Sequence, residues 1–315
     1  MDGIIVVHKE KGFTSFDVVA KLRGILKQKK IGHTGTLDPD ATGVLPVCLG
    51  CATKLCDMLT DTKKVYEAEL LLGITTDTQD ISGAVLEERE VTVTENEVRT
   101  VITSFIGEQK QIPPMYSALK VDGKKLYELA REGKTVERKA RDITIESIEI
   151  LDMNLPKVRM LVTCSKGTYI RTLCNDIGEK LGCGGAMASL IRRKTAGFTL
   201  EEAKTLDEIE TIMKAGEIAS VIKGVDAVFE HYPKAVVKED FMKAVQNGNW
   251  LYPKMLNFET VSTQSSTGSQ VQMTDYGKYE DIRIYGTDDI FYGVYGYVEE
   301  KKAFIPKKMF FYKVQ

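Results

Sequence analysis

One short segment of the chain concentrates the side chains best suited to chemistry. Residues 32–43 read Gly-His-Thr-Gly-Thr-Leu-Asp-Pro-Asp-Ala-Thr-Gly and bring Asp38, Asp40 and His33 together. The glycines, proline, threonines and aspartates are typical of turns, and functional side chains are frequent on loops held between regular elements. A carboxylate on such a loop can serve as a nucleophile, a base or a metal ligand.

Four interpretations of this segment compete on spacing alone. Asp38, Asp40 and Gly43 follow the first half of a calcium loop, but its twelfth position is Leu49 rather than a bidentate glutamate. A P-loop would need Gly-Lys-Ser/Thr after the glycines, which this segment lacks. A single Gly-x-x-Gly is a weak match to the RNA clamp of KH domains. The fourth interpretation is a tight turn in which Asp38 accepts a hydrogen bond from a backbone N–H.

Hydrophobic spacing predicts the elements that hold this loop. We expect a buried strand over Gly3–Val7, a helix capped by Thr14 or Ser15, a loop over Ile31–Gly43 and a strand over Val44–Leu49. Further along, the same patterns predict strands at Lys63–Leu72, Ile143–Leu151 and Val158–Ser165, and helices at Thr94–Phe105, Lys125–Glu132 and Tyr169–Leu181. Because no regular βαβ alternation appears, the pattern favours an α+β fold with a mixed or antiparallel sheet.

The composition of the chain changes near His231. The residues that follow are rich in Tyr, Phe and Gly, with alternating runs at Asp281–Tyr285 and Phe291–Val298. We therefore expect a domain over 1–230 and a small β-rich module over 231–315, in which Val261–Gln270 forms a flexible hairpin loop.

Composition also bounds the class of protein. The 315 residues are 43% hydrophobic and 28% charged, which excludes intrinsic disorder as the main state. No apolar run is long enough to span a membrane, and the N-terminus carries charges that do not suit a secretory signal. The six cysteines are irregularly spaced, so we expect reduced thiols in a cytoplasmic protein. Cys48 and Cys51 with nearby Cys56 lack the second pair that a structural zinc site needs.

Charge is unevenly distributed. The chain has 43 basic and 45 acidic side chains, a net charge of −2 that argues against indiscriminate binding to polyanions. Residues Gln109–Arg141, however, carry nine basic against four acidic side chains, a net charge of +5. This segment is either a cationic binding face or simply a solvated charged surface.

Six motifs in the same order resemble the bacterial tRNA pseudouridine synthase B family. Besides the Asp38 segment, the matching blocks are His8–Ser15, Lys64–Ala68 with Thr76–Gly83, Pro113–Lys120 with Gly123 and Tyr127, Lys166–Arg171, and Leu181–Gly184 with Leu190 and Arg192. Glu10 stands where the family's first motif usually has proline. The resemblance implies a pseudouridine-synthase fold with an RNA-gripping insertion at about 108–142, and a C-terminal module that resembles a PUA domain only loosely.

The resemblance also implies a reaction and roles for its residues. The enzyme would isomerise uridine 55 of the tRNA TΨC loop by breaking the N1–C1′ bond, turning the uracil and rejoining it through C5. This chemistry needs no cofactor and no metal. Asp38 would be the catalytic carboxylate, attacking C1′ or C6 or acting as a base in a glycal route, with Arg171 as its counter-ion. Tyr169 would handle a proton at C5 or pack beneath the sugar, unless it is a core tyrosine.

The remaining implied residues contact the flipped nucleotide and the RNA. Tyr66 would stack on the flipped base, Leu190 would line the uracil pocket, and His33 would fill the space left in the RNA loop. We expect phosphate contacts from Lys9, Lys120, Lys124, Lys125, Arg131, Arg141 and Arg192. The expected partner is the TΨC stem-loop of tRNA, bound by a monomer. Two alternatives stay open: a synthase for another RNA, and a non-catalytic tRNA chaperone that kept the fold.

Overall fold

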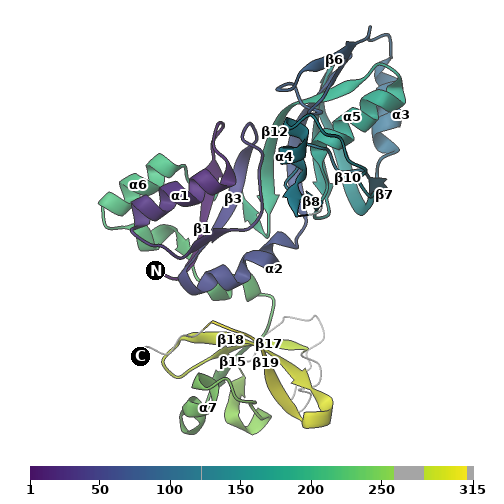
Figure 1. Ribbon diagram of the computed structural model, residues 1–315. Helices are drawn as coiled ribbons and strands as arrows, with labels where there is room; N and C mark the ends of the chain where they lie inside the picture. The colour runs from purple at the N-terminus through teal and green to yellow at the C-terminus, as the bar shows by residue number, and fades with distance from the viewer. Residues whose placement is uncertain (122, 259–279, 311–315) are drawn as a thin grey trace.

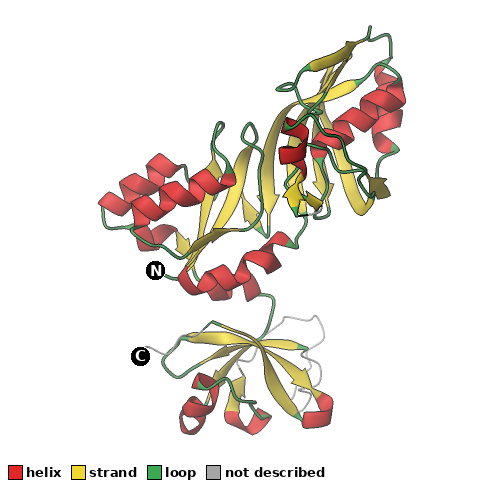
Figure 2. Cartoon of the chain, viewed as in Figure 1, coloured by secondary structure: helices red, strands yellow, loops and turns green. Residues whose placement is uncertain are grey.

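The computed structural model describes residues 1–121, 123–258 and 280–310, which form two sheets with helices around them (Figure 1). The larger sheet runs through the elongated upper body, and the smaller sheet lies below it (Figure 2). The predicted loop at Val261–Gln270 lies outside the described residues.

The larger sheet has ten strands and is mostly antiparallel. Its main path is β14 (Ile222–Lys223), β1 (Gly3–Lys9), β3 (Thr42–Leu49), β12 (Gly185–Thr195), β4 (Lys64–Leu72), β11 (Lys157–Cys164), β10 (Arg141–Asn154) and β7 (Gly107–Gln111). Short strands β2 (Ile31–His33) and β13 (Phe198–Thr199) pair with β3 and β12. In this sheet β3 and β12 pair in parallel, through Ile191 with Thr42 and Arg192 with Gly43. The predicted α+β class with a mixed sheet is confirmed.

Helices cover this sheet, and three of them begin at a threonine cap. The larger ones are α1 (Ser15–Leu26), α3 (Glu95–Thr103), α5 (Ile170–Leu181) and α6 (Leu206–Lys214), with the short α2 (Cys56–Thr60) below the sheet. Thr14 caps α1 in a reciprocal capping box with Asp17, as Thr94 does for α3 with Glu97. The chain leaves α5 at Gly182, whose φ of 80° is the left-handed conformation that glycine adopts at low cost.

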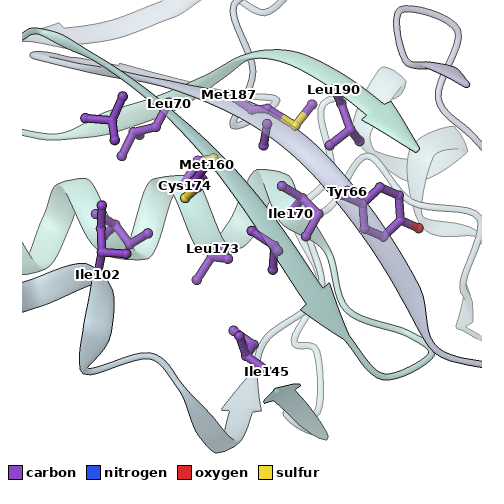
Figure 3. Close-up of a cluster of buried hydrophobic side chains, with 14 of the residues drawn as sticks. Tyr66, Leu70, Ile102, Ile145, Met160, Ile170, Leu173, Cys174, Met187 and Leu190 are labelled. Carbon is purple, nitrogen blue, oxygen red and sulfur yellow. The ribbon is translucent and has the colours of Figure 1, made fainter. Parts of the chain in front are cut away.

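Helix α5 is anchored in a buried apolar cluster. Its residues Ile170, Leu173, Cys174 and Ile177 pack with side chains of β4, β10, β11, β12 and α3, as Figure 3 shows for many of them. Ile170 is only 3% exposed and directly precedes Arg171. The core therefore fixes the first turn of this helix, and with it the direction in which Arg171 leaves the backbone.

The segment between β7 and β10 carries little regular structure. It contains the two-stranded pair β8 (Lys120–Val121) and β9 (Lys124–Lys125), followed by α4 (Leu126–Arg131). A second small hairpin, β5 (Ile74–Thr76) with β6 (Val85–Glu88), follows β4.

The smaller sheet is built from residues near the C-terminus. Its order is β16 (Leu256–Phe258), β15 (Lys234–Val237), β17 (Asp281–Tyr285), β18 (Phe291–Val298) and β19 (Ala303–Met309), with α7 (Met242–Gln246) against it. It has its own core, which includes Tyr292, Tyr295 and Phe304. The ring of Phe229 packs at a tilt against Phe291 and Phe310, and so joins the two parts of the chain through one aromatic cluster.

Candidate active site

The Asp38 loop connects β2 to β3 and is tied down at both ends. The backbone N–H and the hydroxyl of Thr34 both donate to the carbonyl of Pro46, each at 3.1 Å. The N–H of Leu37 donates to Ser15 Oγ at 2.9 Å, which attaches the loop to the start of α1. The expected loop over Ile31–Gly43 is therefore shorter than predicted, because β2 and the start of β3 lie within it.

Lys9 supports this loop from below. Its ammonium donates to the carbonyls of Glu10, Pro39 and Ala41, at 3.1, 3.1 and 2.5 Å. The side chain is fully buried, and burial lowers the pKa of Lys9 to about 8 despite the nearby Asp38 and Asp40 carboxylates. The expectation that Lys9 contacts an RNA phosphate is therefore wrong, since its ammonium is enclosed by backbone oxygens.

The close approach of Gly43 to Arg192 explains why the loop ends with a glycine. Gly43 has a φ of 110°, and a Cβ there would lie 2.3 Å from the carbonyl oxygen of Arg192 on β12. The Arg192 side chain is 1% exposed, and its Nε donates to the carbonyl of Val44 at 2.7 Å. The predicted phosphate contact of Arg192 is also wrong, because this guanidinium lies inside the sheet beneath the loop.

Arg171 meets Asp38 with two nitrogens. Its Nε lies 3.0 Å from Oδ2 of Asp38 and its Nη2 lies 3.3 Å from Oδ1. The guanidinium is 6% exposed, whereas the Asp38 side chain is 41% exposed. The cation of the pair is therefore buried, whereas its carboxylate is accessible to a substrate.

The Arg171 guanidinium has three further partners. Nη2 donates to the carbonyl of Tyr116 at 2.8 Å, and Nη1 donates to the carbonyl of Thr78 at 3.2 Å. Nη1 also lies 3.5 Å from the carboxylate of Asp80. Asp80 in turn accepts from the hydroxyl of Thr78 at 2.8 Å. This network fixes the plane of the guanidinium, and therefore the orientation of Asp38.

Two opposing effects act on the Asp38 carboxyl. Burial raises its pKa above the ordinary value of 3.8, and the charges of Asp80 and Asp40 act in the same direction. Arg171 and Lys9 oppose this rise. The pKa of Asp38 is raised overall, so the fold disfavours the ionised form relative to water.

Tyr66 and Leu190 lie close to each other at the edge of the apolar cluster. Figure 3 shows Tyr66 beside Ile170, with its hydroxyl pointing away from the cluster. Tyr66 opposes Arg192 across β4 and β12, and Leu190 opposes Ala68 in the same register. Burial raises the pKa of Tyr66, so its phenol is neutral at pH 7.

Tyr169 and His33 lie on the elements next to the pair: Tyr169 at the start of α5, which carries Arg171, and His33 at the end of β2, which leads into the Asp38 loop. Tyr169 is the N-cap residue of α5, two positions before Arg171, and burial raises the pKa of its phenol. His33 ends β2, and its Nδ1 lies 3.1 Å from the carbonyl of Gly35. Burial lowers the pKa of His33, which is thus a neutral, half-buried side chain at the base of the loop.

Comparison with known proteins agrees with this geometry. Residues 23–170 match the TruB family pseudouridylate synthase N-terminal domain, and residues 171–230 match the tRNA pseudouridylate synthase B C-terminal domain. The tRNA pseudouridine synthase B of Lachnoclostridium phytofermentans is 55% identical over 98% of this chain and 100% of its own length. The chain belongs to the tRNA pseudouridine synthase B family. Members of this family are isomerases that form pseudouridine.

Further comparisons also show similarity to pseudouridine synthase proteins. The tRNA pseudouridine synthase B of Alkaliphilus oremlandii is 52% identical over 81% of this chain and 85% of its own. Among solved structures, a Cbf5–Nop10–Gar1 complex contains a chain with a TM-score of 0.69 and 26% identity. That likeness covers 98% of this chain and 85% of that one.

Basic residues of the segment between β7 and β10 lie on the surface of this pseudouridine synthase. Lys120, Lys124, Arg131 and Arg141 are exposed, and Lys125 is half-buried with its ammonium 3.1 Å from the Tyr127 hydroxyl. The Tyr116 carbonyl that Arg171 holds belongs to this segment. The expected phosphate contacts of these five side chains stay a prediction.

Sequence reasoning missed several contributors to the Arg171 network. The sequence marks Asp80 only as part of a motif, although its carboxylate faces the guanidinium. The roles of the Thr78 and Tyr116 carbonyls cannot be predicted from residue type, because every residue has a backbone carbonyl. The six-motif resemblance was the one signal that could have marked these positions.

Two further findings bear on the class of site. Within the described residues, no group of three or more His, Cys, Asp or Glu side chains is arranged to hold a metal ion. None of the helices in the described part of the chain is long and apolar enough to cross a membrane.

Proposed function

We propose that this synthase isomerises uridine 55 in the TΨC loop of tRNA, with Asp38 as the catalytic carboxylate and no cofactor. The observation that supports this most is the Asp38–Arg171 pair, in which a reachable carboxylate is oriented by a buried guanidinium.

Asp38 acts in its ionised form in each of the three routes. It attacks C1′ of the sugar, attacks C6 of the base, or removes a proton from the sugar to give a glycal. Arg171 favours the ionised form by its charge and orients both carboxylate oxygens by its planar fork. Atoms balance within the nucleotide, because the N1–C1′ bond breaks, a C5–C1′ bond forms, and the proton on C5 is transferred to N1.

The groups around the pair suit a flipped-out uridine. The ring of Tyr66 is proposed to stack on the uracil, a contact worth about 1–3 kcal/mol. Leu190 lines the uracil pocket beside it, and Tyr169 packs under the sugar or handles the proton at C5. His33 props the RNA loop from which the nucleotide has been turned out.

The RNA is held mainly through its phosphates and its shape. The exposed cations of the segment between β7 and β10 are proposed to contact the backbone of the TΨC stem-loop: Lys120, Lys124, Lys125, Arg131 and Arg141. The β-rich residues after 231 are proposed to add a second RNA-binding module, and one protein chain is proposed to act on one tRNA.

The test is incubation of the protein with an unmodified tRNA transcript, in buffer without cofactor or added magnesium. Carbodiimide labelling followed by primer extension locates pseudouridine at single-nucleotide resolution. We expect a carbodiimide-dependent stop that assigns pseudouridine to position 55, and no such stop in a matched transcript with cytidine there. Pseudouridine only elsewhere would favour a synthase for another RNA, and binding without any pseudouridine would favour a chaperone.

A further inference from the structure

A buried amide holds the backbone of Tyr169. Gln111 is the last residue of β7 and is 5% exposed. Its Oε1 accepts from the backbone N–H of Tyr169 at 2.8 Å, and its Nε2 donates to the carbonyl of Tyr169 at 3.0 Å. The side chain therefore pairs with the peptide groups of Tyr169 as a neighbouring strand would.

This pairing takes the place of an ordinary helix cap. Tyr169 is the N-cap residue of α5, and its own side chain makes no capping hydrogen bond. At an N-cap the backbone N–H would otherwise be left without an intrahelical partner. Gln111 reaches that N–H from a strand 58 positions earlier in the chain and so fixes the point where α5 begins.

We infer that Gln111 is a positioning residue for the isomerisation, which sets the backbone from which Tyr169 and Arg171 project toward Asp38. The inference rests on the proposed function. Arg171 lies two residues after Tyr169 and holds Asp38 with atoms 3.0 and 3.3 Å apart. A shift of the first turn of α5 moves both side chains, because Tyr169 and Arg171 both project from that turn.

The same residue joins the site to the segment between β7 and β10. The chain continues from Gln111 directly into that segment, and the Tyr116 carbonyl, five residues later, accepts from Nη2 of Arg171. Arg171 and Tyr169 are thus held from opposite ends of one short stretch, 111–116. Gln111 keeps the stretch and the helix in register when RNA contacts the exposed cations beyond it.

The first test compares Q111L with Q109L. Gln109 has the same residue type, lies on the same strand and faces the same side of the sheet, but among the described residues it makes no recorded hydrogen bond to Tyr169, Arg171 or Asp38. We expect Q111L to lower the single-turnover rate constant at saturating RNA by about 10- to 100-fold, as small misplacements of catalytic groups do. We expect Q109L to stay within about twofold of wild type, and the Kd for RNA to change little in both.

The second test uses the pH dependence of Q111E. A purely structural role for Gln111 would not predict such a dependence. An ionised glutamate accepts from the Tyr169 N–H but directs its other oxygen at the Tyr169 carbonyl. A protonated glutamate donates to that carbonyl and restores both hydrogen bonds. We expect the ratio of the Q111E rate to the wild-type rate to rise as pH falls from about 8 to about 5.5, while the Q111L ratio stays flat.

Charged groups near position 111 do not alter the comparison of the Q111E rate with the wild-type rate. Arg141 opposes Gln111 across β7 and β10, Arg171 follows Tyr169 by two residues on α5, and Asp176 of α5 lines a pocket with Lys110 and Arg138. These groups are present in wild type and variant alike. The titration of Asp38 occurs in wild type and variant alike, so it cancels in the ratio.

The outcomes separate this inference from the proposed function. Wild-type rates in Q111L, equal losses in Q111L and Q109L, or a Q111E ratio that stays flat with pH would each overturn the positioning role. Loss of pseudouridine formation in wild type itself would instead overturn the proposed function. Thermal unfolding of the variants shows whether a slow variant is folded. If Q111L does not fold, the pH response of Q111E decides the question.

Discussion

Arg171 holds both oxygens of Asp38, although the two residues lie 133 positions apart. The contact joins the loop between β2 and β3 to the first turn of α5. The guanidinium is buried and also donates hydrogen bonds to the carbonyls of Thr78 and Tyr116, so its position does not depend on Asp38 alone. Asp38 is the more exposed member of the pair, with 41% of its side chain accessible.

Replacing Arg171 by lysine tests whether charge alone is enough. Lysine keeps the positive charge but lacks the planar fork that reaches Asp38, Thr78 and Tyr116 together. We expect R171K to lower the single-turnover rate constant by at least about 100-fold, with RNA affinity within a few-fold of wild type. A rate near wild type would show that the bidentate geometry does not matter.

Replacing Lys9 by methionine tests the support beneath the loop. The change removes three hydrogen bonds to backbone carbonyls in a fully buried place, so we expect a loss of about 2 kcal/mol in unfolding free energy. K11M is the control, because the Lys11 side chain is 74% exposed and lies 3.9 Å from Asp40. Chemical denaturation of both variants gives the comparison, and equal stabilities would contradict the role of Lys9.

The raised pKa of Asp38 predicts how stability depends on pH. The native state binds the Asp38 proton more tightly than the unfolded chain, whose carboxyl titrates near 3.8. Ionising Asp38 at neutral pH therefore costs the native state free energy, and this cost disappears as pH falls below 3.8. We expect D38N to unfold at the same or a higher temperature than wild type at about pH 7, with the gap closing toward pH 4. D40N is the control for losing one loop carboxylate, and a D38N protein markedly less stable at neutral pH would refute the expectation.

Salt dependence tests the cationic segment. If its five side chains contact phosphates, the Kd for a TΨC stem-loop rises steeply between 50 and 200 mM salt, by about 10-fold or more. A K124A/R131A double variant should have a shallower slope of log Kd against log salt, while its single-turnover rate at saturating RNA stays near wild type. A slope unchanged from wild type would remove these two residues from the interface.

Much of the fold could be predicted because local patterns agree with the tertiary structure. The capping pairs Thr14–Asp17 and Thr94–Glu97 mark two helix starts, and β10 and β11 pair as their alternation predicts. Strand β12 went unrecognised because Arg192, Arg193 and Lys194 look like a surface cluster. In the sheet, Arg192 is buried and Arg193 pairs with Glu67 at 2.6 Å.

The site was predictable in part for the same reason. Asp38, Tyr66 and Arg171 sit in motifs whose residue types carry the chemistry, so sequence alone points to them. Whether a lysine faces RNA or the protein interior depends on packing that residue type does not encode. Lys9 and Arg192 were therefore misplaced, and the Gln111 amide could be found only from its contacts with Tyr169.

The most direct test of the central claim is D38N in a single-turnover assay with a TΨC stem-loop transcript. Asparagine keeps the shape of Asp38 but cannot act as an anionic nucleophile or base. We predict no detectable pseudouridine at uridine 55, with a Kd for the RNA within a few-fold of wild type. Turnover at the wild-type rate would contradict the assignment of Asp38 as the catalytic carboxylate.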